Sequence, residues 1–262
     1  MTTADIDVEL SAPVNLRDLG GISITGGVLR HGLAVRADDL SIVTEAAARE
    51  LVDGGLTAVI DLRSPEEVAI TGRGPFAGYP VAYHHLPLIP NVSDSMSASM
   101  PKGVPVIDHT AMGQMYVGMV EGAAPQLVTA LNVIAHAPGA TAFHCAAGRD
   151  RTGVLAAVLL LVLGATDDDI VTDYARTGAN MTAIMERTRG SMGVLLLRLG
   201  LDVDAQRSAV VESDGQDGPM ETSMRILLAT LRERHGDALG PLRAAGLGDD
   251  TIARLRQRAL AA

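Results

Sequence analysis

One ten-residue segment, 144–153, limits the folds open to this chain more than any other feature. It reads His-Cys-Ala-Ala-Gly-Arg-Asp-Arg-Thr-Gly and lies between two apolar runs, 140–143 and 154–163. A short apolar run, a glycine-containing loop and a longer apolar run predict a buried strand, a tight turn and a buried helix. We therefore expect an α/β fold with a central, mainly parallel sheet flanked by helices.

The loop of this segment contains the only cysteine of the chain, Cys145, and an arginine six positions later, Arg151. Backbone N–H groups of a loop that enters a helix point into one concavity, and with the helix dipole they bind anions. Arg151 can hold two oxygens of a phosphate bound there. Cys145 lies in the same positive field, which favours the nucleophilic thiolate. The segment thus predicts attack by sulfur on phosphorus.

The other loop residues have supporting roles in this prediction. Gly148 permits backbone angles that the turn needs, and the Thr152 hydroxyl is placed to stabilise the departing thiolate. The expected phosphate-binding residues are Ala146, Ala147, Gly148, Arg149, Asp150, Arg151 and Thr152. No metal or other cofactor is expected, because arginine and the loop amides already supply positive charge.

The arrangement Cys-x5-Arg-Thr after His144 resembles the signature loop of the cysteine-dependent protein tyrosine phosphatases. The longer string is similar to that of bacterial tyrosine and lipid phosphatases of the mycobacterial phosphatase B type, whose loop usually reads Cys-x-x-Gly-Lys-Asp-Arg-Thr-Gly. Arg149 replaces the usual lysine. The string Asn-Leu-Arg-Asp-Leu-Gly-Gly at 15–21 resembles an element near the start of the same phosphatases, and we expect Arg17 and Asp18 to support the site.

This resemblance implies a tyrosine-phosphatase-like fold and the hydrolysis of phosphate monoesters through a phosphocysteine. Phosphotyrosine in a protein is the first substrate expected. The alternative is a phosphoinositide, or dual specificity for protein and lipid, because Arg149 adds charge that suits further phosphates. A phosphate-binding module without catalysis is a distant alternative, since the nucleophile and the arginine are both intact. A thiol-redox role is disfavoured because the chain has no second cysteine.

The resemblance also implies a helical lid over the active site. We expect one phosphatase domain over residues 1–262, with the lid at about 178–220. This region contains a methionine-rich helical stretch, and methionine side chains adapt readily to changing contacts. Ordinary core packing of that stretch is the alternative.

Two carboxylic acids compete for the role of proton donor to the leaving group. Asp61 ends an apolar stretch, 56–62, that predicts a strand, and ligands bind at the carboxyl ends of parallel strands. Its alternative roles are capping the turn at Ser64 or pairing with Arg63. Asp150 lies inside the cysteine loop between two arginines, whose charges favour its carboxylate form. Its alternative roles are orienting Arg149 or positioning water.

Composition limits the partners and the location. The net charge of −10 disfavours nucleic acid or an anionic membrane as a general partner. The start of the sequence has no basic, apolar leader, and the longest apolar run is too short to span a bilayer. We therefore expect a cytoplasmic protein, or one exported without a Sec-type signal peptide.

Overall fold

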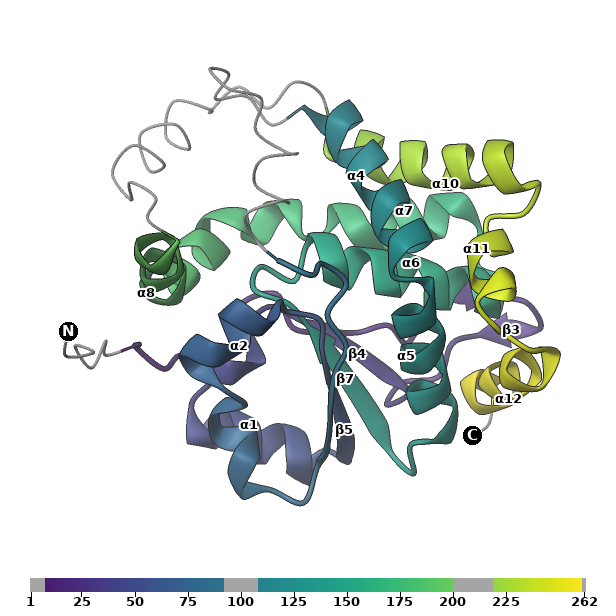
Figure 1. Cartoon of the computed structure of the whole chain (residues 1–262). Coiled ribbons are helices and arrows are strands. Elements are labelled where there is room, and N and C mark those ends of the chain that lie inside the picture. The colour runs from purple at the N-terminus through teal and green to yellow at the C-terminus, as the bar shows by residue number, and fades with distance from the viewer. Residues whose placement is uncertain (1–7, 92–107, 200–218, 261–262) are drawn as a thin grey trace.

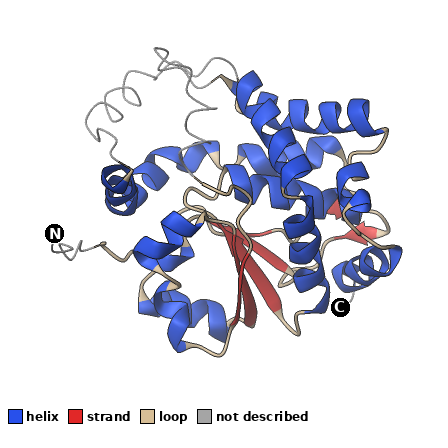
Figure 2. Cartoon of the chain, in the orientation of Figure 1, coloured by secondary structure: helices blue, strands red, loops and turns tan. Residues whose placement is uncertain are grey.

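The computed structural model describes residues 8–91, 108–199 and 219–260 (Figures 1 and 2). A five-stranded sheet has the order β1-β4-β7-β5-β6; β1 is antiparallel to β4, and the other neighbours are parallel. Its strands are β1 (Arg17–Asp18), β4 (Ala34–Ala37), β5 (Leu56–Asp61), β6 (Ala82–His85) and β7 (Ala140–His144), and β2 (Ser23–Ile24) pairs with β3 (Gly27–Val28) in a separate hairpin. The expected α/β architecture is confirmed.

Helices cover both faces of the sheet. Figure 1 shows α1 and α2 on one side of the strands and α5 and α12 on the other. The helices are α1 (Glu45–Asp53), α2 (Pro65–Thr71), α4 (His109–Gly122), α5 (Ala124–His136), α6 (Asp150–Leu163), α7 (Asp167–Ala175), α8 (Met181–Arg198), α10 (Glu221–His235), α11 (Gly240–Ala244) and α12 (Asp249–Leu260), with 3-10 turns at Leu40–Ile42, Gly74–Gly78 and Gly178–Asn180. A small apolar cluster lies on the α1 side, and a larger one includes α4, α5, α6, α10 and α12.

Helix α6 lies at the centre of the larger cluster. Almost every side chain from Arg151 to Leu163 is buried, which explains why this helix is apolar on all sides rather than along one stripe. It contacts β4 and β7 beneath it and α4, α5, α7 and α12 around it. The N-terminus of α6 is therefore held firmly, and the cysteine loop is attached to it.

The register of the sheet brings two predicted site residues to one edge. In the parallel pairing of β5 with β7, Asp61 lies opposite His144, the residue before Cys145. Helix α2 starts just beyond Asp61, with Ser64 and Glu67 forming a reciprocal capping box at its N-terminus. The carboxyl ends of β5 and β7 thus position the site, as expected for a parallel sheet.

Helices α4 and α5 follow each other directly, with only Ala123 between them. Among the described residues, no single helix is both long and apolar enough to cross a membrane. Together α4 and α5 have that length and composition, but they are bent by 76° and their apolar side chains belong to the core. Strand β3 is only two residues long, and β4, which lies between β1 and β7, was not predicted from the sequence.

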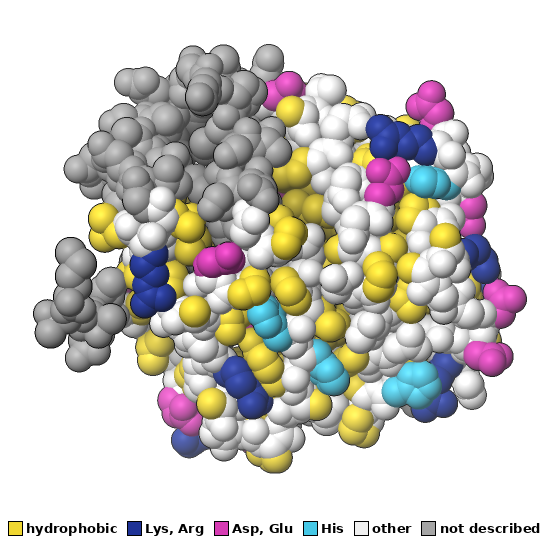
Figure 3. All heavy atoms as spheres, in the orientation of Figure 1, with side chains coloured by type: hydrophobic (Ala, Val, Ile, Leu, Met, Phe, Trp, Pro, Cys, Tyr) yellow, Lys and Arg dark blue, Asp and Glu magenta, His cyan; other side chains and the backbone are white. Residues whose placement is uncertain are grey.

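The described surface has no broad basic area on the face drawn in Figure 3. Basic side chains there are spread singly or in small groups, with acidic ones among them. This distribution agrees with the net charge of −10. On that face, positive charge is not gathered into a surface for a polyanion.

Candidate active site

The loop between β7 and α6 holds the predicted nucleophile and arginine. Cys145 follows β7 and is 1% exposed, while Arg151 lies in the first turn of α6. Burial alone would lower the pKa of Arg151, but the charge of Glu67 raises it above its ordinary value. The loop thus begins at the predicted nucleophile and ends in the helical turn that carries the predicted arginine.

The carbonyl groups of the loop point away from its concave side. The Ala146 oxygen accepts from the Asp39 N–H at 3.0 Å, and the Gly148 oxygen accepts from Arg36 Nη2 at 2.9 Å and from Asn15 Nδ2 at 3.3 Å. In a trans peptide the C=O and the following N–H point in opposite directions. The N–H that follows each of these carbonyls is thus directed inward, where an anion needs donors.

Gly148 is required in this loop for two reasons. Its φ of +67° lies in the left-handed region, which residues with a side chain rarely adopt. A Cβ at this position would also lie 2.5 Å from the Ala37 carbonyl oxygen. The loop consequently packs directly on the backbone at the end of β4.

A buried ion cluster supports the loop from behind. Arg36 is fully buried, and its Nη1 donates to Asp173 on α7, which also accepts from Arg17 Nε at 2.8 Å. Burial raises the pKa of Asp173, but the two arginines hold it below its usual range. Arg17 therefore has the expected supporting position, whereas Asp18 accepts from backbone N–H groups and fixes a nearby turn.

Arg151 is oriented by Glu67 of α2. Its Nη1 and Nη2 donate to the two carboxylate oxygens at 2.5 and 2.9 Å, a bidentate pair of the strong kind. Burial raises the pKa of Glu67, but Arg151 and the Ser64 N–H hold it below its usual value. The carboxylate stays charged, and one edge of the guanidinium is fixed.

Comparison with known proteins identifies the family to which the chain belongs. The model of the tyrosine phosphatase family matches residues 8–261. The chain belongs to the tyrosine phosphatase family. The triple specificity protein phosphatase PtpB of Mycobacterium tuberculosis is 27% identical, over 95% of this chain and 97% of that one.

Two further relatives carry tyrosine phosphatase names. A tyrosine-protein phosphatase of Nostoc commune is 27% identical, over 86% of this chain and 73% of that protein. A predicted tyrosine-protein phosphatase of Cupriavidus necator is 32% identical, and the match spans 64% of this chain and 62% of that protein. The family membership confirms the resemblance drawn from the cysteine loop, and with it the assignment of this chain as a phosphatase that acts on phosphorylated substrates.

Asp61 lies in this phosphatase as a buried partner of Arg63. The side chain is 0% exposed; it accepts from Arg63 Nη2 at 2.6 Å and from the Tyr83 hydroxyl at 2.7 Å, and His144 Nε2 lies 3.7 Å away. Burial alone would raise its pKa, but the His144 ring and the Arg63 guanidinium hold that pKa well below its usual range. Pairing with Arg63, one of the alternatives for Asp61, is what the structure contains.

Asp150 has a different environment. It is the first residue of α6, its side chain is 29% exposed, and Oδ1 accepts from the buried Tyr116 hydroxyl of α4. Arg149 Nε lies 3.7 Å from the same oxygen. Among the described residues, no partner is found for Oδ2, so Asp150 has a fixed oxygen and a free one.

Arg149 points into the protein rather than into solvent. The residue is 4% exposed, and its guanidinium donates to the Tyr174 hydroxyl at 3.4 Å and to the Met112 sulfur at 3.3 Å. Burial would lower its pKa, but Asp150 and the tyrosines raise it above the ordinary value. Arg149 stays charged beneath the surface.

Two further predictions concern the Thr152 hydroxyl and the absence of a metal ion. Thr152 is fully buried, and its hydroxyl has no hydrogen-bond partner within the described part of the chain. The same residues contain no group of three or more His, Cys, Asp or Glu side chains that can hold a metal ion.

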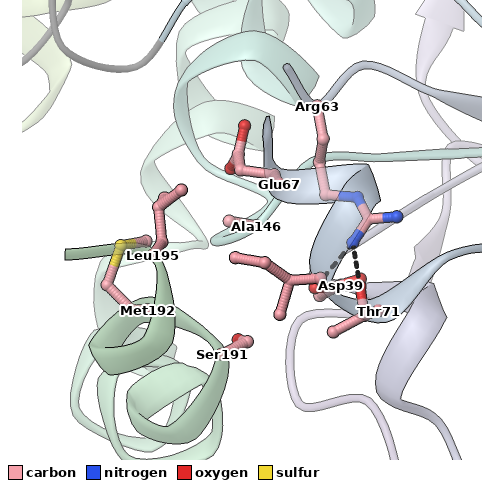
Figure 4. Close-up of a pocket in the computed structure, with 9 residues that line it drawn as sticks. Asp39, Arg63, Glu67, Thr71, Ala146, Ser191, Met192 and Leu195 are labelled. Carbon is pink, nitrogen blue, oxygen red and sulfur yellow. Dashed lines mark hydrogen bonds and ion pairs between the residues drawn. The ribbon is translucent and has the colours of Figure 1, made fainter. Parts of the chain in front are cut away.

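Helix α8 lies beside the cysteine loop across a small cavity of about 10 Å³. Figure 4 shows Met192 and Leu195 of α8 on one side and Glu67 and Arg63 on the other, with Ala146 between them. Such a volume holds about one water molecule. The expected lid at 178–220 is thus described only for its first half, because residues 200–218 lie outside the described residues.

Sequence reasoning missed most of the residues that hold the loop. Glu67 had a visible signal, because Ser64-Pro-Glu-Glu is a capping-box pattern, but the pattern does not show that the carboxylate also binds Arg151. Tyr116 lies in an apolar helical stretch and had no local signal at all.

Proposed function

We propose that this phosphatase hydrolyses phosphotyrosine through a phosphocysteine at Cys145. The observation that carries the proposal is the loop itself: it joins a buried cysteine to an arginine fixed by Glu67, and its Ala146 and Gly148 carbonyls are bound by groups outside the loop. Such prearranged donors stabilise charge that develops in the transition state without reorganising.

The reaction has two steps. The Cys145 thiolate forms an S–P bond, the bond from phosphorus to the phenolic oxygen breaks, and Asp150 gives its proton to that oxygen. Water then attacks phosphorus, Asp150 takes a proton from the water, and the S–P bond breaks to return the thiolate. Arg151 and the N–H groups of residues 146–152 hold the non-bridging oxygens in both steps.

Asp150 suits the proton transfer better than Asp61. A proton donor must reach the leaving oxygen, and Asp150 is partly exposed at the rim of the loop with Oδ2 free of described partners. Asp61 is fully buried as a carboxylate bound to Arg63. Its role in this proposal is to hold β5 and the start of α2 together beside the loop.

Matched Asp→Asn variants test the assignment. With phenyl phosphate as substrate, Asp150→Asn should lower kcat about 100-fold or more. With p-nitrophenyl phosphate the decrease in kcat should be much smaller, because that leaving group needs less protonation. Asp61→Asn should lower the melting temperature without that leaving-group dependence. The reverse pattern would assign the acid to Asp61. Cys145→Ser should still bind phosphate esters but release no phosphate, and turnover in that variant would refute the mechanism.

Phosphoinositide hydrolysis is the second candidate. It requires additional positive charge open to the head group, and Arg149 was its expected source. Because Arg149 is committed to Tyr174 and Met112, phosphotyrosine is the better supported substrate. Arg149→Ala should therefore reduce turnover of a phosphotyrosine peptide and of a phosphoinositide by similar factors; a selective loss on the lipid would favour the second candidate.

Helix α8 is proposed as part of a lid. Its Met192 and Leu195 approach α2 and Ala146, so a bulky substrate must displace them to reach the loop. Met192→Ala should raise kcat/KM for a phosphopeptide more than for p-nitrophenyl phosphate. Leu197→Ala, which alters an exposed side chain of the same helix, is the control. Equal effects on both substrates would contradict the lid.

A further inference from the structure

We infer that Tyr116 is a positioning residue for the proton donor and that it sets the alkaline limb of the pH–rate profile. The inference rests on the proposed role of Asp150. Tyr116 comes from α4, 34 residues before Asp150 in the chain, and its hydroxyl donates to Asp150 Oδ1. It deepens the proposed mechanism by assigning the group that holds the acid.

The hydrogen bonds around Asp150 form a chain with one direction. Arg149 Nε donates to the Tyr174 hydroxyl at 3.4 Å, and the Tyr174 and Tyr116 oxygens are 2.7 Å apart. A tyrosine hydroxyl has one proton. Because the Tyr116 proton goes to Asp150, the proton between the two tyrosines comes from Tyr174. Every donor is thus used once, and the chain ends on the carboxylate.

This arrangement leaves the second carboxyl oxygen for chemistry. Tyr116 fixes Oδ1, and within the described residues Oδ2 has no partner, so Oδ2 is the oxygen that carries the transferred proton. Tyr116 is fully buried, and its burial and the Asp150 charge raise its pKa well above the ordinary value. The hydroxyl therefore remains a donor throughout the pH range of a phosphatase assay.

The charged and titratable groups around Asp150 come from three sides. Tyr116 reaches Asp150 from α4. Tyr174 on α7 and Arg149 in the loop complete the chain of hydrogen bonds that ends on Asp150. Arg151 on α6 interacts with Asp150 electrostatically. Among these groups, only Tyr116 donates a hydrogen bond to Asp150, whereas Arg149 Nε lies 3.7 Å from the same oxygen. Removing its hydroxyl should therefore favour the protonated acid.

The test compares two Tyr→Phe variants. Tyr116→Phe removes the hydroxyl on Asp150, and Tyr83→Phe removes the equivalent hydroxyl on Asp61. With phenyl phosphate, Tyr116→Phe should move the alkaline limb of the kcat profile to higher pH by about half to one pH unit and lower the maximal kcat about 5- to 10-fold. KM should change less than about twofold, and Tyr83→Phe should leave the limb in place.

Failure of the inference is distinguishable from failure of the proposed acid. If Asp150→Asn shows the leaving-group-dependent loss but Tyr116→Phe leaves the limb unmoved, the inference is wrong and the acid stands. If Asp150→Asn shows no such loss, the acid assignment fails first. Should Tyr116→Phe not fold, Tyr174→Phe removes the donor to Tyr116. It should move the limb in the same direction by a smaller amount, and an unmoved limb would overturn the inference.

Discussion

Replacing Glu67 by glutamine should weaken catalysis by releasing Arg151. The carboxylate holds Nη1 at 2.5 Å and Nη2 at 2.9 Å, and it also accepts from the Ser64 N–H at 2.7 Å. A guanidinium has five N–H groups in a fixed fork. The two bound by Glu67 leave three, including Nε–H, for phosphate oxygens. Glu67 thus fixes the guanidinium plane before substrate arrives.

The size of the effect follows from the hydrogen bonds lost. Glutamine has nearly the same shape and also serves in a capping box, so α2 should persist. The exchange removes one hydrogen bond between charged groups, worth about 1.5–3 kcal/mol. At about 1.4 kcal/mol per factor of ten, kcat/KM for phenyl phosphate should fall about 10- to 100-fold. The free energy of unfolding should fall too, because Arg151 keeps only a neutral partner.

The assay is steady-state hydrolysis of phenyl phosphate, with inorganic phosphate as competitive inhibitor. Glu66→Gln is the matched control: it removes a carboxylate from the same helical turn, and no Glu66–Arg151 contact is found among the described residues. Its kinetics should stay near those of the unmodified protein. Tighter phosphate inhibition together with higher kcat/KM in Glu67→Gln would mean that Glu67 competes with phosphate for Arg151, which would refute the reasoning.

Three further predictions concern stability and the loop. The pKa values of Asp61 and Glu67 in the folded protein lie below their values near 4 in the unfolded chain. These two carboxylates therefore stabilise the fold fully above about pH 5, and this contribution is lost as the pH falls through the folded-state pKa values. Urea unfolding midpoints measured at several pH values test this. Gly148→Ala should abolish phosphate binding, measured by calorimetry, because of its φ of +67° and the Ala37 contact. Arg258→Ala should lower the free energy of unfolding by about 2 kcal/mol, because it loses hydrogen bonds to the Ile134 and Gly139 carbonyls. The control Arg243→Ala removes an exposed ion pair and should lower it by less than about 0.5 kcal/mol.

The sequence predicts the parts of the fold whose signals are local. The run 154–163 is a helix because it is long and apolar, and Thr44, Ser64 and Thr166, residue types that favour helix starts, each cap the helix that follows them. Strand β4 was missed because its four residues, Ala-Val-Arg-Ala, contain an arginine and do not alternate. That arginine is buried only because Asp173, 137 residues away, neutralises it. No local pattern contains this information.

The residues that carry out the chemistry have local sequence signals, whereas the residues that hold them in place do not. The nucleophile, the anion-binding backbone, the arginine and the proposed acid all lie within 145–152, because a phosphate is small enough for one short loop to surround it. One turn cannot also fix its own carbonyls and side chains, since the outer side of the loop must be bound by something else. The supporting groups come from five separate places in the chain: Asn15, Arg36, Glu67, Tyr116 and Asp173. A motif therefore identifies the reaction, whereas the groups that tune its arginine and its acid become visible only when the sheet and helices bring them together.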